Sequence, residues 1–410
     1  MLKKNNILFI LPTLPWPLEF GGNQAMFNGI ATLVDVANVY ITYIVYGKEK
    51  NTEQKENMIK ELGGKVTVLP YVEVPKINTC RKIFKLILQA LDKWVFTKDI
   101  DCFLEKQIHI KQPSNGEITF INKIIENYKI DIVQVEMLSH LAIVNSLPQT
   151  VRKVFVHHEL GYVRVSQILK ENNCNNYYHS LAATSKIEEI ALLNKYDDII
   201  VLSEIDKQKL VDEGVKAHIH ASFAIVKTPD TFNPIIDDYH NIVFIGPSQH
   251  KPNFYAIKWF LDNCWNALLK TDSKFKLLIV GKWDKTSINQ ISKGYKNLNF
   301  MGFVKDLHTV LQNGIMIVPL TIGSGIRMKI LEAAANGIPV VSTTIGAEGL
   351  PLTDGTNGYL ADEPESFVNR IISLSNQTLR LQFVNNLNSI IRDQYSFDAL
   401  KQNRRKILGL

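Results

Sequence analysis

A short glycine loop precedes a helical segment in the last third of the chain. Gly323-Ser324-Gly325 follows the apolar run Ile315–Val318, which has the pattern of a buried strand. It precedes Ile326–Asn336, which is followed by Gly337 and Pro339, as the end of a helix commonly is. The first amides of a helix have no partner within it, the helix dipole adds positive potential, and glycine lets the backbone come close to a ligand. The sequence therefore predicts a phosphate-binding loop at this point.

Charged residues accompany the glycine loop on this helical segment. At about 100° per residue, Lys329 and Glu332 lie on one face, about 60° apart, and Arg327 lies in the first turn on another side. The cations would neutralise a diphosphate, and the carboxylate would accept hydrogen bonds from a ribose diol. The alternative is an ordinary Lys–Glu pair on an exposed face. Because apolar residues crowd the rest of the segment, Glu332 lies close to a buried stripe, where a carboxylate needs a partner.

Histidines and acids follow two strand-like runs of the first half. His157-His158-Glu159 comes directly after the strand-like Lys153–Val156, and Glu136 comes after Asp131–Val135. Folds of the α/β class bind ligands at the carboxyl ends of their strands, so His158, His157 and Glu136 are candidates for catalysis. The alternatives are that the histidines lie in a turn or pack in the core, and that Glu136 is a surface acid.

The elements that must position these residues alternate between strand and helix, twice along the chain. Such alternation predicts two parallel sheets, each covered by helices on both faces. The segment 227–238, KTPDTFNPIIDD, is rich in Pro and Asp and predicts a linker between domains 1–226 and 239–385, with a closing helical segment 386–410 that packs back toward the first domain. The strand candidates are Ile7–Leu11, Val39–Tyr43, Val66–Leu69, Asp131–Val135, Lys153–Val156 and Asp198–Leu202, then Asn241–Ile245, Lys276–Val280, Asn299–Met301, Ile315–Val318 and Pro339–Ser342.

Composition restricts the classes of partner and compartment. A formal net charge of +6 over 410 residues suits anionic small molecules or a membrane surface, and it lacks the dense basic stripe of a nucleic-acid binder. The four cysteines lie far apart, which disfavours a structural zinc or a disulfide framework. The apolar run Ile7–Leu11 is too short for a signal peptide, and no run reaches the roughly 18 apolar residues that span a bilayer. We therefore expect a cytoplasmic protein.

A basic amphipathic segment, Cys80–Phe96, is open to two interpretations. Its sequence CRKIFKLILQALDKWVF mixes four basic residues with large apolar ones. One interpretation is a helix that lies on anionic lipid at the inner face of the cytoplasmic membrane, near a lipid-linked acceptor. The other is a helix packed on the sheet, with its lysines extending to water.

Three segments resemble one family of enzymes, in the same order along the chain. GSGIRMKILEAAANGIPVVSTTIGAEGL (323–350) resembles the donor site of retaining GT-B glycosyltransferases of the large family four, the glycosyl transferases group 1. FIGPSQHKPNFYAIKWF (244–260) is similar to the opening of their C-terminal domain, and LPTLPWPLEFGGNQAMF (11–27) to their glycine turn after the first strand. The resemblance covers nearly the whole chain and implies two facing Rossmann-like domains with parallel sheets.

The resemblance also implies roles for particular residues. Glu332 stands where the family's second motif glutamate bonds the nucleotide ribose, and Gly21 and Gly22 stand in the loop whose amides face the donor phosphate and sugar. A histidine after this strand faces the transferred sugar in the family, which favours His158 over His157, because His158-Glu159 is similar to a His-Asp pair. The remaining donor-site candidates are backbone or charged groups: Lys251, Ser324, Gly325, Ile326, Arg327, Lys329 and Gly346.

Two positions depart from the family's pattern. Ser324 stands where the family's E-x7-E motif has its first glutamate, which contacts the hydroxyls of the sugar. The family's arginine after the glycine of the first C-terminal strand is absent: Pro247 follows Gly246, and Lys251 is the nearest base. The hypothesis that follows is that Arg327 and Lys329 supply much of the charge that neutralises the diphosphate.

The resulting prediction is a retaining glycosyltransferase that uses a nucleotide diphosphate-sugar and a glycan or lipid-linked acceptor, in bacterial-type surface polysaccharide synthesis. It needs no metal or other cofactor, because Arg and Lys replace the metal's charge and no Asp-x-Asp motif lies in a suitable loop. Two alternatives stay open: a non-catalytic GT-B-like subunit that binds a nucleotide or a partner, favoured by Ser324, and a sugar-nucleotide epimerase. Nucleic acid is not an expected partner.

Overall fold

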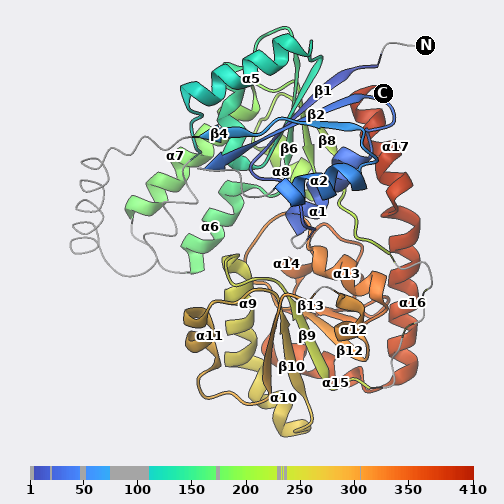
Figure 1. Cartoon of the computed structure of the whole chain (residues 1–410). Helices are drawn as coiled ribbons and strands as arrows, with labels where there is room; N and C mark the ends of the chain where they lie inside the picture. Colours follow the sequence, from blue (N-terminus) through green and yellow to red (C-terminus); the bar gives the residue numbers. More distant parts are fainter. Residues whose placement is uncertain are drawn as a thin grey trace.

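Two parallel sheets, one in each half of the chain, form the framework of the protein (Figure 1). The computed structural model describes residues 4–18, 21–46, 52–73, 110–171, 176–228, 238–304 and 306–410, together with residues 232 and 234. The last strand of the first sheet ends at Ala221, and the first strand of the second sheet begins at Asn241. All of the strand pairs described below are parallel.

The first sheet has the strand order β3-β2-β1-β5-β6-β7-β8, and β4 extends it by pairing with β2. Its strands are β1 Asn6–Leu11, β2 Asn38–Tyr46, β3 Val66–Val68, β4 Tyr71–Glu73, β5 Ile132–Glu136, β6 Arg152–His157, β7 Asp198–Val201 and β8 His218–Ala221. The helices around it are α1 Gly21–Ala31, α2 Thr52–Glu61, α5 Asn115–Asn127, α6 Gly161–Glu171, α7 Asn176–Leu193 and α8 Glu204–Asp212, with a 3-10 turn, η1, over Leu138–Ser146.

Both faces of the first sheet are covered, so successive residues of its central strands enter two different cores. In β1, Ile7 and Phe9 belong to the core that α1 and the end of the chain complete, whereas Leu8 and Ile10 belong to the core under η1 and α5. The same alternation sends Ile132 of β5 to the first of these cores and Val133 to the second. Consecutive residues at the ends of these strands therefore face opposite layers.

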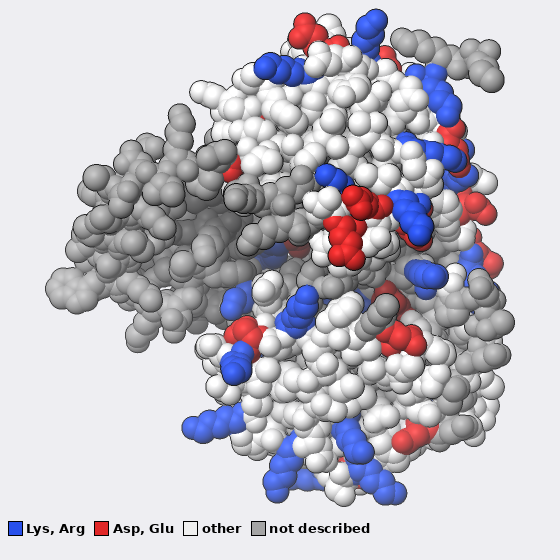
Figure 2. Space-filling view, in the orientation of Figure 1, with Lys and Arg blue, Asp and Glu red and all other residues white. Residues whose placement is uncertain are grey.

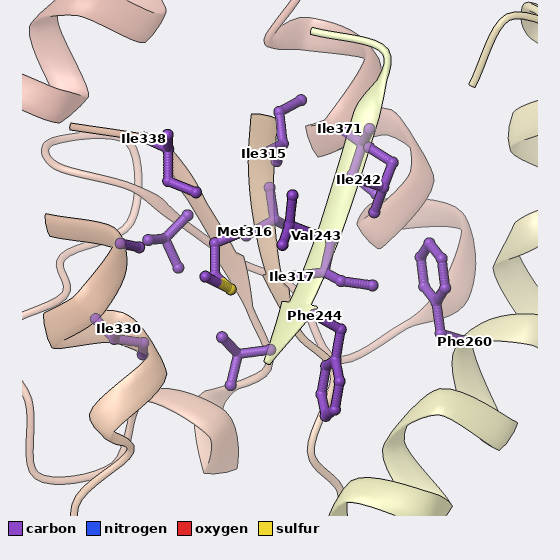
Figure 3. Packing of buried hydrophobic residues seen from close by; sticks show 14 of the residues in the cluster. Ile242, Val243, Phe244, Phe260, Ile315, Met316, Ile317, Ile330, Ile338 and Ile371 are labelled. Atoms are coloured by element: carbon purple, nitrogen blue, oxygen red, sulfur yellow. The ribbon is translucent and has the colours of Figure 1, made fainter. Parts of the chain in front are cut away.

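The second sheet has the order β11-β10-β9-β12-β13-β14. Residues of β9 and β12 form the middle of its core, between Ile330 and Ile338 on one side and Phe260 and Ile371 on the other (Figure 3). Its strands are β9 Asn241–Ile245, β10 Lys276–Val280, β11 Leu298–Gly302, β12 Gly314–Val318, β13 Val340–Ser342 and β14 Tyr359–Leu360. Its helices are α9 Lys251–Phe260, α10 Asn266–Thr271, α11 Lys285–Ser292, α12 Leu307–Leu311, α13 Met328–Asn336, α14 Thr344–Ala347 and α15 Pro364–Ser373, with a π turn, η2, over Leu261–Trp265.

The last two helices join the domains along one side of the molecule (Figure 1). Helix α16 (Gln377–Gln394) stays on the second domain, where Asn388 Nδ2 donates to the carbonyl of Ala334 at 2.8 Å. Helix α17 (Phe397–Leu408) packs on the first domain: Arg152 Nη1 donates to the carbonyl of Leu408 at 2.9 Å, and Arg405 Nε to that of Thr32 at 3.0 Å. The predicted return of the closing segment to the first domain is confirmed.

The predicted fold, two facing Rossmann-like domains with parallel sheets, is confirmed, and three short strands were not predicted. Strands β4, β8 and β14 have two to four residues each and little apolar periodicity. One helix boundary was wrong, because α13 begins at Met328 and not at Ile326. The basic segment Cys80–Phe96 lies outside the described residues.

On the face shown in Figure 2, lysines and arginines are mixed with acidic residues and form no single stripe. Among the helices that the structure describes, none is long and apolar enough to cross a membrane.

Candidate active site

The start of α1 in the first domain lies directly against the start of α13 in the second. A Cβ atom on Gly21 would come within 2.7 Å of Met328 Cγ, and one on Gly22 within 3.0 Å of Met137 Cε. A side chain at Gly21 would push the domains apart, so the absence of a Cβ at this position is what allows the contact, whereas a side chain at Gly22 would press on Met137 of the first domain itself. The glycine turn predicted after the first strand thus lies at the domain interface.

The glycine loop of the second domain is also docked on the first domain. The amide of Gly323 donates to Gln167 Oε1 at 2.6 Å, and Ser324 Oγ donates to the carbonyl of Leu160 at 3.1 Å. Gly325 has φ +77°, and a Cβ there would collide with the carbonyl oxygen of His158. The loop therefore fits against the segment that leaves β6, and the amide of Gly323 is already engaged.

Arg327 has a different place from the one predicted. It is the residue before α13, with φ −90° and ψ 84°, and not a residue of the first turn. Its guanidinium donates to the carbonyls of Ser324 and Gly325, the latter at 2.7 Å, and reaches that of Ile345 at 3.4 Å. The left-handed conformation of Gly325 keeps the chain out of helical geometry for two more residues, which explains the wrong boundary. Arg327 thus holds the loop together from inside.

Lys329 and Glu332 share the face of α13 that points toward the interface. Lys329 Nζ donates to Asn253 Oδ1 at 3.0 Å and lies over the ring of Phe244, 5.0 Å from its centroid. Burial, with Arg327 nearby, lowers the pKa of Lys329 to about 7. Glu332 Oε1 accepts from Gln24 Nε2 of the first domain at 3.4 Å, a long hydrogen bond, and burial raises the pKa of Glu332 to about 7. Both groups therefore retain capacity for a ligand.

Gly346 and Ile326, whose backbone was predicted to line the donor, contact other parts of the protein. The amide of Gly346 donates to Thr343 Oγ1 at 2.9 Å as part of the cap of α14, so it is not free for a ligand. Ile326 is partly buried and packs against the core of the second domain. Lys251 is the first residue of α9 and lies over the ring of Phe254, 5.4 Å from its centroid.

The two histidines at the end of β6 lie on opposite faces of the sheet, His157 as the last residue of the strand and His158 directly after it. His157 Nε2 contacts Glu189 Oε1 of α7 at 2.8 Å, and Glu189 also accepts from the amides of Gly161 and Tyr162 at 3.3 and 3.1 Å. His158 Nε2 instead contacts Glu136 Oε2 at 2.6 Å. The structure therefore brings His158 and Glu136 together and places His157, whose side chain is fully buried, in a separate packing contact.

Sequence analysis missed a group of charged residues at the same interface. Glu159 pairs with Arg164 of α6, and Arg327 and Lys329 of the second domain also act on this group. His250, which precedes α9, is surrounded by them: burial lowers its pKa to about 4, Glu159 opposes that shift, and the three cations add to it. Three cations around one carboxylate and a neutral imidazole leave an excess of positive charge, which suits an anionic ligand. The sequence HKPN (250–253), which follows β9, is the local pattern that could have identified His250.

No arrangement suited to a metal ion is present in the described part of the chain. The described residues contain no group of three or more His, Cys, Asp or Glu side chains that could hold one. The ionisable groups at this interface are buried cations, a carboxyl group and a histidine–carboxylate pair. The excess of positive charge makes this set complementary to an anionic ligand.

Comparison with known proteins agrees with this chemistry. Residues 239–377 match the family model for glycosyl transferases group 1. The chain is 24% identical over 245 residues to an uncharacterized 44.6 kDa protein in the cps region of Klebsiella pneumoniae, a match that spans 57% of this chain and 60% of that protein. It is 24% identical over 264 residues to an uncharacterized glycosyltransferase of Methanocaldococcus jannaschii, spanning 63% and 69% of the two chains.

Solved structures similar to this one share its whole architecture. TarM superposes with a TM-score of 0.68 at 14% identity, covering 100% of this chain and 99% of that one. HepE of Anabaena, in complex with UDP and glucose, gives 0.66 at 12% identity with 99% of both chains covered. Sucrose-phosphate synthase of Thermosynechococcus elongatus gives 0.68 at 12% identity, covering 99% and 98%. At such low identity these likenesses establish the fold, which is GT-B.

Proposed function

We propose that this GT-B chain, whose residues 239–377 match the family model for glycosyl transferases group 1, transfers a sugar, with retention, from a nucleotide diphosphate-sugar to a glycan or lipid-linked acceptor. The observation that carries the proposal is that α13, which bears Lys329 and Glu332, follows the loop that meets the carbonyl of His158, and that Glu332 reaches Gln24 of the first domain. Cations, a carboxyl group and a histidine thus come from two domains to one place.

The donor is proposed to bind chiefly through its nucleotide and diphosphate. Glu332, whose carboxylate accepts only the long hydrogen bond from Gln24 at 3.4 Å among the described residues, accepts hydrogen bonds from the ribose diol. Lys329, Arg164 and the start of α1 at Gly21 surround the diphosphate. The first candidate is a UDP-sugar, because the structure of S. aureus TarM contains UDP and one of HepE contains UDP-glucose. No metal is required in this proposal, since buried cations supply the charge.

The transfer step needs no strong base on the protein. The bond between the anomeric carbon and the diphosphate oxygen breaks, and the acceptor oxygen bonds to the anomeric carbon on the same face. The acceptor's proton passes to the departing diphosphate. The protein's part is to position the two substrates and to stabilise the developing charge. His158, oriented by Glu136, is proposed to contact the transferred sugar, while Ser324 replaces the carboxylate that would otherwise bind its hydroxyls.

The acceptor is proposed to be a precursor of a bacterial surface polysaccharide. The Klebsiella relative is encoded in a cps region, which is the support for this class of product. Contact of residues 80–96 with the cytoplasmic face of the membrane would bring the site near a lipid-linked acceptor, and this remains a proposal. A vesicle-flotation assay with and without anionic lipid tests it.

The experiment that tests the function is a thermal-shift screen against UDP-, GDP-, ADP- and dTDP-sugars, followed by NMR detection of donor hydrolysis. A bound donor must raise the unfolding temperature, because it binds the native state alone. The Glu332→Gln variant should lose that shift, and Glu365→Gln, at an exposed position of α15, should keep it. Release of the sugar first as the donor's anomer would support retention. Absence of both shift and hydrolysis with every donor would favour the non-catalytic subunit.

A further inference from the structure

Asn253, in the first turn of α9, lies buried beside the turn that connects β9 to this helix and is 2% exposed. Its Nδ2 atom donates to the carbonyl of Pro247 at 3.0 Å, and a Cβ atom on Gly246 would come within 2.4 Å of the same nitrogen. From the other side, Trp283 Nε1 donates to the carbonyl of Gly246 at 2.8 Å. The turn therefore fixes the side-chain amide of Asn253 in one place.

The other end of this amide faces Lys329 of α13. Lys329 Nζ donates to Asn253 Oδ1 at 3.0 Å. An ammonium group can only donate and the carbonyl of Pro247 can only accept, so both contacts require the same orientation of the amide. The oxygen of Asn253 therefore holds Lys329, while the nitrogen of the same amide is held by the turn.

Both neighbours that hold the ammonium group of Lys329 are neutral. They are the oxygen of Asn253 and the ring of Phe244, whose centroid lies 5.0 Å from Nζ. Within the described residues Lys329 forms no ion pair, and the carboxylate of Glu159 pairs with Arg164 instead. A desolvated cation without a carboxylate partner is costly, and an anionic ligand reduces that cost. Lys329 is therefore oriented while its charge is left uncancelled.

We propose that Asn253 is a positioning residue of the diphosphate site: it directs the ammonium group of Lys329 through a neutral acceptor and so leaves the full charge of the lysine to the ligand. The inference rests on the proposed function, because it takes the diphosphate of the donor as that ligand. An aspartate of nearly the same shape would still accept from Lys329, but it would cancel the lysine's charge and repel a diphosphate.

The experiment measures the binding of UDP and of uridine to Asn253→Asp and Asn253→Ala by titration calorimetry. Asn253→Asp keeps the size of the side chain and should weaken UDP binding about tenfold or more, because it removes one positive charge from the site. Asn253→Ala loses both hydrogen bonds but adds no charge, and it should weaken UDP binding only about threefold. Uridine, which has no phosphate, should bind the parent and both variants equally.

Asn388 provides a matched control, because it is another buried asparagine with the same pattern of contacts. It is 4% exposed, its Nδ2 atom donates to the carbonyl of Ala334 near the far end of α13, and its Oδ1 atom accepts from Arg392 Nε at 2.9 Å. Asn388→Asp makes the same chemical change away from the interface, so it should leave UDP affinity within about twofold of the parent.

NMR of Lys329 in the ligand-free protein separates this inference from the proposed function, since it needs no nucleotide. Lys329 should titrate at a higher pH in Asn253→Asp than in the parent, because a carboxylate favours the charged lysine. Arg327 and His250, the other titratable groups that act with Lys329, are the same in both proteins. If this titration moves while the parent binds no UDP, the proposed function fails and the contact of Asn253 with Lys329 is still supported.

Three results would overturn the proposal: an unchanged titration of Lys329 in Asn253→Asp, UDP binding by that variant as tight as by the parent, or weaker UDP binding by Asn253→Ala than by Asn253→Asp. A purely structural role would produce the last of these, since alanine removes more contacts than aspartate does. If Asn253→Asp does not fold, Asn253→Ala provides the test. Its Lys329 should titrate at a lower pH than in the parent, because an acceptor is lost, and an unchanged titration would overturn the pairing.

Discussion

The carbonyl oxygen of His158 occupies the place that a Cβ atom on Gly325 would need. The segment leaving β6 in the first domain and the glycine loop of the second domain are therefore in direct backbone contact. Residues 167 apart in sequence meet here, and the contact exists because Gly325 has no side chain and adopts a positive φ of 77°. The relative position of the two domains at the proposed site depends on it.

Gly325→Ala is expected to lower kcat/KM for the donor by about tenfold or more, because the new methyl group must move the loop away from His158. Gly355→Ala is the matched control. Gly355 has a similar φ of +70°, but nothing lies within 4 Å of the position that its Cβ atom would take, so this variant has the backbone strain without the collision. Gly355→Ala should lose about 1–2 kcal/mol in the free energy of unfolding, and Gly325→Ala should lose more because it adds the collision to the strain; urea denaturation measures both. Equal kcat/KM values for the two variants would contradict the explanation.

Glu332→Gln is expected to stabilise the ligand-free protein while it weakens donor binding. The folded-state pKa of Glu332, about 7, lies above its ordinary value of 4.5. The folded state therefore binds more protons than the unfolded state between these values, and Glu332 lowers stability as pH rises through this window. The glutamine should raise the free energy of unfolding by about 1–3 kcal/mol at pH 8 and have little effect at pH 4.5.

Urea denaturation at both pH values measures this difference, and isothermal titration with the donor measures the loss of affinity. Loss of a charged hydrogen bond to the ribose should weaken binding by about 1.5–3 kcal/mol. A stability gain that is the same at pH 4.5 and pH 8 would show that desolvation of this carboxyl group is not its source.

Substitutions of Lys329 and Arg327 should have different effects on the free energy of unfolding, although the sequence predicted that both residues bind the diphosphate. Arg327 is bonded to the carbonyls of Ser324 and Gly325, so Arg327→Met should reduce the free energy of unfolding by about 2–4 kcal/mol. Lys329 is desolvated, and its pKa of about 7 lies below its ordinary value of 10.5. The charged form of Lys329 therefore destabilises the ligand-free fold below pH 7, and this destabilisation is lost as the pH rises toward 10. Lys329→Met should therefore be as stable as the parent or more so at pH 6.

The affinity for the donor is the second property in which we compare the Lys329 and Arg327 variants. Lys329→Met should weaken binding of the nucleotide diphosphate by about tenfold or more, since a desolvated cation is lost. Titration calorimetry of both variants with UDP, alongside Lys285→Met in α11 as a control away from the interface, measures this. Unchanged affinity in Lys329→Met would remove this residue from the diphosphate site.

The sequence predicted the fold through local patterns, and the proposed site only in part. Apolar runs such as Asn241–Ile245 and Lys276–Val280 are strands with the predicted bounds, because a strand buried on both faces is recognisable from its own residues. Glu332 and Lys329 were found because helical spacing places them on one face. Their pKa values depend on burial between domains, which no local pattern encodes.

Features that depend on contacts between distant segments were missed. The partner of Glu332 is Gln24, 308 residues away, and the amide of Gly323 is bound by Gln167, 156 residues away. Arg327 was misplaced because the positive φ of Gly325 delays the start of α13, and a glycine in the sequence permits such a conformation without requiring it.

His157 and His158 provide the sharpest pair of variants, because strand alternation sends adjacent residues to opposite layers. His157 is fully buried against Glu189, so His157→Ala should lower the free energy of unfolding by about 2–4 kcal/mol by leaving a cavity and a carboxylate with fewer partners. His158→Ala should lower kcat by about a hundredfold while it is still folded, because His158 is the ring that Glu136 orients toward the substrate in the proposed mechanism. It should also lose stability, since the buried Glu136 loses its ring partner. Thermal unfolding and steady-state kinetics on both variants distinguish the roles. Full turnover in His158→Ala, or lost turnover at unchanged stability in His157→Ala, would assign the catalytic contact to the other face of the sheet.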